Sequence, residues 1–275
     1  MCDSDWSSDV CSSDLAHAPA AGRGVSTMNF MAHRGYSARF VENTLPAFTA
    51  AVEYTRTAPN LIGCELDLQL TADERIVVLH DTKICDAQGA VHDICRCTYG
   101  DLQEISARKK ALRGERIPTI EEVFDAVRHR LILCCELKAG ECDQRRFCET
   151  VAGELDRYAP SGDIQISSFD AGLLQTMIDV AGGRDIAFAL LFRDWDQWDR
   201  APDALKSRLS FIHPHHSCVR ADPGRVQKTG LPAQTWTVDD PKIIEQLAAM
   251  SKDIDLRTIM TNDITLAQRF AGGAR

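Results

Sequence analysis

The stretch of sequence that decides the fold is LIGCELDLQL, at residues 61–70. Its apolar residues are interrupted by two carboxylates, Glu65 and Asp67. Side chains alternate across a β-strand, so both carboxylates point to one face while Cys64 and Leu66 point to the other. We therefore expect a strand whose apolar face packs against helices and whose carboxylates point into the centre of a closed parallel sheet.

Seven further runs are predicted strands, and amphipathic stretches of helical length separate most of them. The eight predicted strands span residues 29–33, 62–68, 131–137, 163–168, 186–191, 209–213, 233–238 and 257–261. This alternation predicts an α/β fold, a (β/α)8 TIM barrel, a fold that commonly takes about 250 residues. Thr119 followed by Glu122 predicts a capping box at the start of the helix before the third strand.

RIVVLHD, at residues 75–81, resembles a strand but does not fit the alternation. It follows the second strand after a short gap, whereas a parallel crossover needs about a dozen residues. We expect it to form a hairpin with the second strand, within a small insertion in the second βα loop at about residues 70–118. Because TIM barrels carry their chemistry on these loops, the insertion is expected to be functional.

Residues 1–27 are expected to form a disordered tail, and residues 28–275 the barrel. The tail begins MCDSDWSSDVCSSDL, which lacks the basic and apolar segments of a signal peptide. This stretch resembles the translation of a sequencing adaptor. We therefore expect the tail to be artefactual and Met28 to be the true start.

The composition narrows the class of partner. A net charge of −9 argues against a nucleic-acid groove or an anionic membrane surface. No apolar run approaches the ~20 residues that span a bilayer. The 11 cysteines are odd in number and several lie in apolar strands, which indicates free thiols in a reducing, cytoplasmic compartment. A zinc site at Cys95 and Cys97 is the alternative, but their spacing is wrong for the usual ribbon.

A third carboxylate, Glu136, lies in the CCELK segment of the third predicted strand. Strands two and three of a barrel are neighbours, so Glu136 should join Glu65 and Asp67 at the C-terminal rim. Three carboxylates with room for water suit one hard divalent cation, Mg²⁺ or Ca²⁺. The alternative is a set of ion pairs with Lys138 and Arg34 inside the barrel.

Two histidines are expected at the same rim. His33 ends the first strand in M-A-H-R-G, and His80 ends the hairpin run in L-H-D. Histidines titrate near neutrality, so one can act as general base and the other as general acid. Arg34 and Lys138 can neutralise a phosphate group between them. The pattern favours transfer of a phosphoryl group.

Of the remaining histidines, His17, His92 and His129 are expected to lie at the surface, and no partner is visible for His92 or His129. His213, His215 and His216 follow the sixth strand, where His213 could face the site. Consecutive loop histidines are more often exposed to solvent, and a second metal locus is the alternative. Trp236, near the end of the seventh strand, is either a core aromatic residue or a wall against an apolar or glycerol group of the substrate.

Motifs in a fixed order cover residues 31–263. They are A-H-R-G at 32–35, E-N-T at 42–44, E-L-D at 65–67, V-V-L-H-D at 77–81, I-P-T-I-E-E-V at 117–123, E-L-K at 136–138, S-S-F-D at 167–170, W-T-V at 236–238 and M-T-N-D at 260–263. Together they resemble the glycerophosphodiester phosphodiesterase family. The resemblance implies hydrolysis of a small glycerophosphodiester to glycerol 3-phosphate and an alcohol.

The resemblance also implies a role for each matching residue. The implied roles are an acid–base pair of His33 and His80, a metal site of Glu65, Asp67 and Glu136, phosphate binding by Arg34 and Lys138, and support of the first loop by Glu42. Val41 departs from the proline that the family usually has before E-N-T. Residues 82–97 lack the family's usual Arg and Thr-Asn-Gly, which leaves the leaving alcohol open.

Two other functions stay open. One is a lysophospholipase D or sphingomyelinase-D-like activity on the same barrel. The other is a non-catalytic barrel that binds phosphate esters. The sequence also leaves open the preferred metal, the oligomeric state, the hydrolytic or cyclic-phosphate route and the assignment of acid and base to the two histidines.

Overall fold

The computed structural model describes residues 28–107, 112, 114–127, 129–158 and 163–271. The tail expected over residues 1–27 lies outside the described residues. Within the described part of the chain, no helix combines the length and the apolar character needed to cross a membrane.

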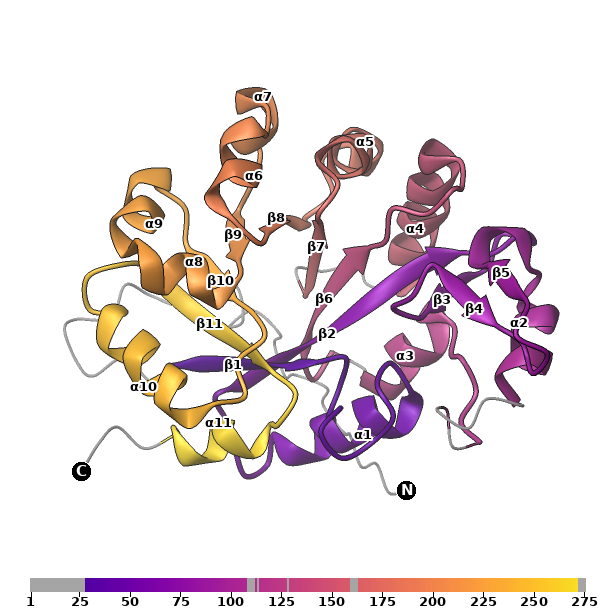
Figure 1. Cartoon of the computed structure of the whole chain (residues 1–275), viewed down its shortest axis with the longest axis horizontal. Helices are drawn as coiled ribbons and strands as arrows, with labels where there is room; N and C mark the ends of the chain where they lie inside the picture. Colours follow the sequence, from indigo (N-terminus) through magenta and orange to yellow (C-terminus); the bar gives the residue numbers. More distant parts are fainter. Residues whose placement is uncertain (1–27, 108–111, 113, 128, 159–162, 272–275) are drawn as a thin grey trace, which may run out of the picture.

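Eight parallel strands close into a barrel (Figure 1). They are β1 (Asn29–His33), β2 (Leu61–Leu70), β6 (Ile132–Leu137), β7 (Ile164–Ser168), β8 (Ala187–Phe192), β9 (Phe211–Pro214), β10 (Ala233–Thr235) and β11 (Leu256–Thr261). The ring closes because β1 pairs with β11 on one side and with β2 on the other. The predicted TIM barrel is confirmed.

Each strand separates an apolar outer layer from the barrel interior. In β1, Phe30 and Ala32 belong to the main hydrophobic core, together with Cys64, Leu66 and other residues that face the helices. The intervening side chains of β1 therefore face the interior, and its last residue, His33, reaches the rim. The alternation expected from the sequence places the polar side chains of the strands inside the barrel.

Helices surround the barrel in Figure 1. They are α1 (Leu45–Tyr54), α3 (Ile120–Val127), α4 (Gln144–Tyr158), α5 (Ala171–Ala181), α6 (Trp195–Arg200), α7 (Asp203–Lys206), α8 (His216–Ala221), α9 (Pro223–Thr229), α10 (Pro241–Met250) and α11 (Thr265–Arg269). The predicted capping box before α3 is present. Glu122 Oε2 accepts a hydrogen bond from the Thr119 backbone N–H at 2.9 Å, and the Glu122 N–H donates to Thr119 Oγ1 at 3.5 Å.

The second βα loop carries a small subdomain, seen beside β2 at the right of Figure 1. It contains β3 (Ile76–Val78), β4 (Lys83–Cys85), β5 (Val91–Asp93), a 3-10 turn (Ile94–Arg96) and α2 (Tyr99–Ala107). β3 pairs antiparallel with the end of β2, which confirms the hairpin. The subdomain has its own apolar cluster, built around Val77, Ile84 and Leu102.

One strand is shorter than predicted. The seventh barrel strand, β10, ends at Thr235 instead of residue 238. Beyond it, Trp236 makes an isolated bridge with His215, and the Val238 N–H donates to the Met260 carbonyl at 2.9 Å. The strand-like sequence continues through this segment, but its regular pairing stops at Thr235.

Candidate active site

Three carboxylates from neighbouring strands meet at one end of the barrel. The parallel pairing of β2 with β6 sets Asp67 beside Glu136, and Glu65 lies on the same face of β2. One ligand oxygen from each residue lies within 4.8 Å of the others, and all three residues are buried. In the described residues, this is the one group of His, Cys, Asp or Glu side chains arranged to hold a metal ion.

Two cations contact this cluster without balancing its charge. Lys138 Nζ lies 2.9 Å from Asp67 Oδ1 and 2.6 Å from Glu136 Oε1. Arg34 Nε lies 3.2 Å from Asp67 Oδ2. The ion pairs considered as the alternative to a metal site are therefore present. However, three carboxylates face only two cations, and among the described residues neither cation side chain forms an ion pair with Glu65.

The surplus negative charge appears in the pKa values of the carboxyl groups. Burial, followed by the charges of Asp67 and Glu136, raises the pKa of Glu65 well above its usual value. Burial and the charge of Asp67 raise the pKa of Glu136 to about 7. Burial also acts to raise the pKa of Asp67, but Lys138 and Arg34 outweigh it and hold that pKa below its usual value. A further positive charge would stabilise all three carboxylates.

His33 is oriented by a chain of hydrogen bonds from the last barrel strand. Its Nδ1 lies 2.7 Å from Asn262 Oδ1. The Asn262 amide donates through Nδ2 to Asp239 Oδ2 at 2.7 Å, which fixes its oxygen toward the histidine. Nδ1 therefore carries the proton, and Nε2, 3.8 Å from Glu65 Oε2, keeps its lone pair. Burial, together with the charge of Arg34, lowers the pKa of His33.

The loop after β1 brings its backbone close to the carboxylates. Arg34 and Gly35 both adopt positive φ, of 56° and 76°. A Cβ at Gly35 would lie 2.7 Å from the Ala47 carbonyl carbon, so only glycine fits there. This turn lets the Arg34 N–H donate to Glu65 Oε2 at 3.1 Å. The exposed Glu42 accepts a hydrogen bond from Arg34 Nη1 at 2.9 Å, so it holds the guanidinium from outside.

His80 reaches the rim from the insertion. The buried Gln69 amide donates to the carbonyls of Leu79 and Asp81, at 2.6 and 2.8 Å, and so ties the L-H-D segment to β2. Asp81 Oδ1 lies 2.9 Å from His80 Nδ1 and orients the ring. The His80 side chain is 36% exposed, in contrast to 15% for His33.

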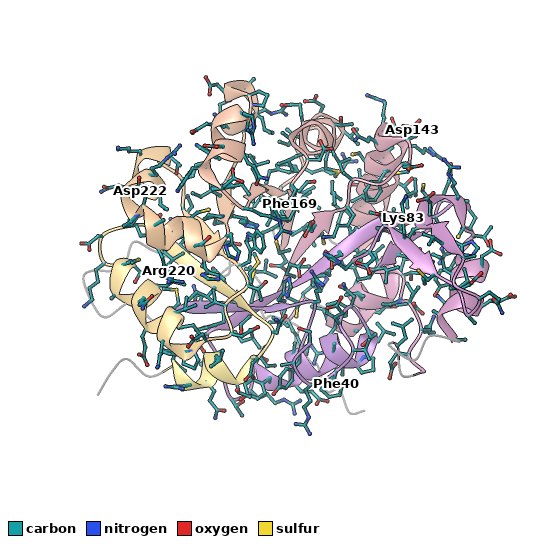
Figure 2. All side chains as sticks on the ribbon, in the orientation of Figure 1. Phe40, Lys83, Asp143, Phe169, Arg220 and Asp222 are labelled. Carbon is teal, nitrogen blue, oxygen red and sulfur yellow. The ribbon has the colours of Figure 1, made fainter. Side chains whose placement is uncertain are left out.

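These residues line one cavity of about 220 Å³. Its lining is His33, Arg34, Glu65, His80, Glu136, Lys138, Ser167, Phe169, Leu191, Arg193, His213, Trp236, Thr237 and Met260. Phe169 lies near the centre of the view in Figure 2, inside the ring of helices. Trp236 stands in the cavity wall, with its Nε1 donating to the His213 carbonyl at 2.8 Å. The structure thus brings together all the predicted site residues. Asp67 and Glu42 do not line the cavity, but both form ion pairs with Arg34.

Of the two interpretations left open for His213, the structure shows the one in which it faces the site. Its side chain is fully buried in β9 and contributes to the cavity lining. His215 and His216 are half-buried, because they cap and begin α8 rather than extend into solvent. In the described residues the histidines do not gather into a second metal site.

His92 and His129, expected to be without partners, each have a carboxylate beside them. His92 Nε2 lies 2.9 Å from Asp86 Oδ2 within the insertion, and His129 Nδ1 lies 3.5 Å from Asp163 Oδ2. Neither lines the cavity around His33. His17 belongs to the tail outside the described residues.

Sequence reasoning did not assign roles to three residues at or beside the cavity. Asn262 and Asp239 orient His33, and Arg193 lines the cavity from the end of β8. Asn262 lies in the M-T-N-D motif, so its place in that motif was the available signal. Asp239 and Arg193 follow strands in polar segments without a recognised motif. Their positions beside Asn262 and in the cavity lining are visible only in the folded barrel.

Known proteins resemble this chain in sequence and in fold. Residues 33–266 match the glycerophosphoryl diester phosphodiesterase family. The chain is 31% identical over 239 residues to YhdW of Bacillus subtilis (strain 168), which is named as a glycerophosphodiester phosphodiesterase; the match covers 82% of this chain and 92% of that one. It is 28% identical to a glycerophosphodiester phosphodiesterase of Caldanaerobacter subterraneus, covering 81% and 90%.

Solved structures support the fold. A phosphodiesterase of Oleispira antarctica, in complex with the product sn-glycerol-3-phosphate, superposes with a TM-score of 0.70 at 20% identity, covering 88% of this chain and 94% of that one. A Thermotoga maritima glycerophosphodiester phosphodiesterase gives 0.66 at 24% identity, covering 87% and 96%. The sequence match spans nearly the whole barrel, including both candidate histidines and all three carboxylates. The chain therefore belongs to the glycerophosphoryl diester phosphodiesterase family.

Proposed function

We propose that this chain hydrolyses glycerophosphodiesters to glycerol 3-phosphate and an alcohol, with His33 and His80 as its acid–base pair and a divalent cation at its carboxylates. The observation that carries the proposal is the convergence of two histidines, two cations and the carboxylates around one cavity of about 220 Å³. A phosphodiester is an anion, and its hydrolysis takes one proton from the nucleophile and gives one to the leaving oxygen. The cavity offers cations to bind the anion and two histidines to move the protons.

Glu65, Asp67 and Glu136 would hold the divalent cation. Their excess of negative charge, and the raised pKa of Glu136, fit a hard cation with oxygen ligands. When bound, Mg²⁺ or Ca²⁺ would supply positive charge that stabilises the charge developing on the phosphoryl oxygens. Arg34 and Lys138, which line the same cavity, would bind those oxygens as well.

His33 is suited to be the general base. Its Nδ1–H is committed to Asn262, which leaves Nε2 as the acceptor. Burial lowers its pKa, so the imidazole is neutral at pH 7 and able to take a proton from the nucleophile. The nucleophile is either water or the neighbouring hydroxyl of the glycerol group.

His80 is then the general acid. It stands on the insertion at the open mouth of the cavity, where the departing alcohol must leave. Its exposed ring can take up a proton from solvent after each turnover. Asp81 orients the ring through Nδ1, so Nε2 would donate to the leaving oxygen.

We favour a water-soluble substrate over a lysolipid. In the described residues, the one large apolar side chain at the surface is Val91, which is 61% exposed, so the described part of the insertion offers no apolar patch for an acyl chain. The complete acid–base and carboxylate set argues against a non-catalytic binding barrel. We further propose a cytoplasmic location, because the 9 described cysteines are all free.

The test is release of glycerol 3-phosphate from glycerophosphoethanolamine, first in EDTA and then with Mg²⁺ or Ca²⁺ restored. We expect release only with metal. His33→Ala should lower kcat at least about 100-fold, whereas His92→Ala, a histidine that also has a carboxylate partner but lies outside the cavity, should not change it. Full activity in EDTA, or an unaffected His33→Ala variant, would contradict the proposal.

A further inference from the structure

Arg193 lines the same cavity as Arg34, but from the opposite side of the ring of strands. It follows β8, which is separated from β1 by three strands in either direction around the eight-stranded ring. Arg34 follows β1, so the two arginines face each other across the mouth of the barrel. Since Arg34, Lys138 and the carboxylates would hold the phosphoryl group, Arg193 is placed to meet another part of the substrate.

The Arg193 guanidinium is held by aromatic rings instead of a carboxylate. It lies 5.0 Å from the Phe169 ring centroid and 5.2 Å from that of Trp236. These two rings meet edge to face at 5.3 Å and form one wall. Stacking of this kind leaves the N–H edges of a guanidinium free to bind an anion.

The positive charge of Arg193 is not paired with a carboxylate in the described part of the chain, whereas that of Arg225 is. Arg225 stacks on a ring too, but it pairs with Asp199. Among the described residues, no Asp or Glu side chain forms an ion pair with Arg193. The adjacent Asp194 is used elsewhere, because its carboxylate accepts a hydrogen bond from the Gln197 N–H at the start of α6.

Arg193 lies where a leaving alcohol would emerge. It is exposed and lines the cavity, as does the partly exposed His80, so both stand at the mouth. His213, fully buried in the same cavity, lies deeper. A leaving group protonated by His80 would emerge within the cavity that Arg193 also lines, so Arg193 can contact it.

We propose that Arg193 selects substrates whose leaving alcohol carries an anionic oxygen, such as a carboxylate, and disfavours those whose leaving alcohol is purely cationic. The aromatic wall of Phe169 and Trp236 would otherwise attract an ammonium group, but its face is covered by a cation of the protein itself. This inference rests on the proposed function and adds the class of the leaving group.

The test uses two substrates that differ by one carboxylate, glycerophosphoserine and glycerophosphoethanolamine. We expect kcat/KM of the wild-type protein to favour the serine ester about tenfold, the size of one charge-assisted hydrogen bond at an exposed site. Arg193→Gln should bring the ratio close to one, by lowering kcat/KM for the serine ester and raising it for the ethanolamine ester. Arg193→Lys, which keeps the charge, should preserve part of the preference.

Arg200→Gln is the matched control, since Arg200 is exposed in the last turn of α6 and does not line the cavity. It should leave the ratio unchanged, and thermal melting should show that all variants fold. Equal turnover of the two esters by the wild-type protein, or a ratio that Arg193→Gln does not change, would overturn the inference and leave the proposed function intact. Absence of turnover of both esters would overturn the two together.

Discussion

Replacing His213 should make the stability of the protein less dependent on pH below neutrality. His213 is fully buried, and burial lowers its pKa to about 3, with the nearby Gln234 amide acting in the opposite direction. The unfolded chain takes up a proton near pH 6.5, whereas the folded protein does so only near pH 3. The free energy of unfolding therefore falls as the pH falls through this window. One proton changes it by about 1.36 kcal/mol per pH unit, which gives a loss of about 2 kcal/mol between pH 6.5 and 5.

The assay is urea unfolding at pH 7.5 and at pH 5, in EDTA, for the wild-type protein and for His213→Gln. Gln is polar, neutral and of similar size, so it removes the titration without leaving a large cavity. Other titrating groups contribute equally to both proteins, so the difference between them isolates His213. The variant should lose about 2 kcal/mol less than the wild type on acidification. An identical loss in both proteins would refute the reasoning.

Three other changes test the surroundings of the site. Asn262→Ala should lower kcat about 10–100-fold with little change in melting temperature, because it frees the His33 ring; steady-state kinetics that match the wild type would contradict this role. In metal-free protein, the raised pKa of Glu136 means that this carboxyl contributes stability that increases as the pH falls from about 7. Thermal melts of Glu136→Gln should lack this contribution relative to the wild type, and should also lack the shift that Mg²⁺ induces. Gly35→Ala should lower the free energy of unfolding by roughly 1–3 kcal/mol in urea. Gly89→Ala is its control, since it shares the positive φ but a Cβ there meets nothing within 4 Å; equal costs would show that contact with Ala47 is unimportant.

Most of the fold could be predicted from the period of the apolar residues. The alternation in LIGCELDLQL placed Glu65 and Asp67 on the inner face of β2, and the short gap to residues 75–81 excluded a parallel crossover. The end of β10 could not be predicted, because the sequence stays strand-like beyond Thr235. Regular pairing stops there and gives way to an isolated bridge between Trp236 and His215.

The candidate site was predictable where its residues lie on strands or in recognisable motifs. The burial of His213 stayed open, because it ends the predicted sixth strand and further histidines follow it in FIHPHHSC; its burial is decided by the face of β9 that points inward. Arg193 and Asp239 follow strands that are distant in sequence from β1. Their relation to His33 and Arg34 arises only when the ring closes.

The central claim is that His80 protonates the leaving alcohol while His33 activates the nucleophile. The most direct measurement compares His80→Ala and His33→Ala on two esters of glycerol phosphate, one with ethanolamine and one with 4-nitrophenol. Nitrophenolate leaves without needing a proton. His80→Ala should therefore lose about 100-fold or more in kcat on the ethanolamine ester and only a few-fold on the nitrophenyl ester, whereas His33→Ala should lose activity on both. An equal loss on both esters for His80→Ala would contradict the account.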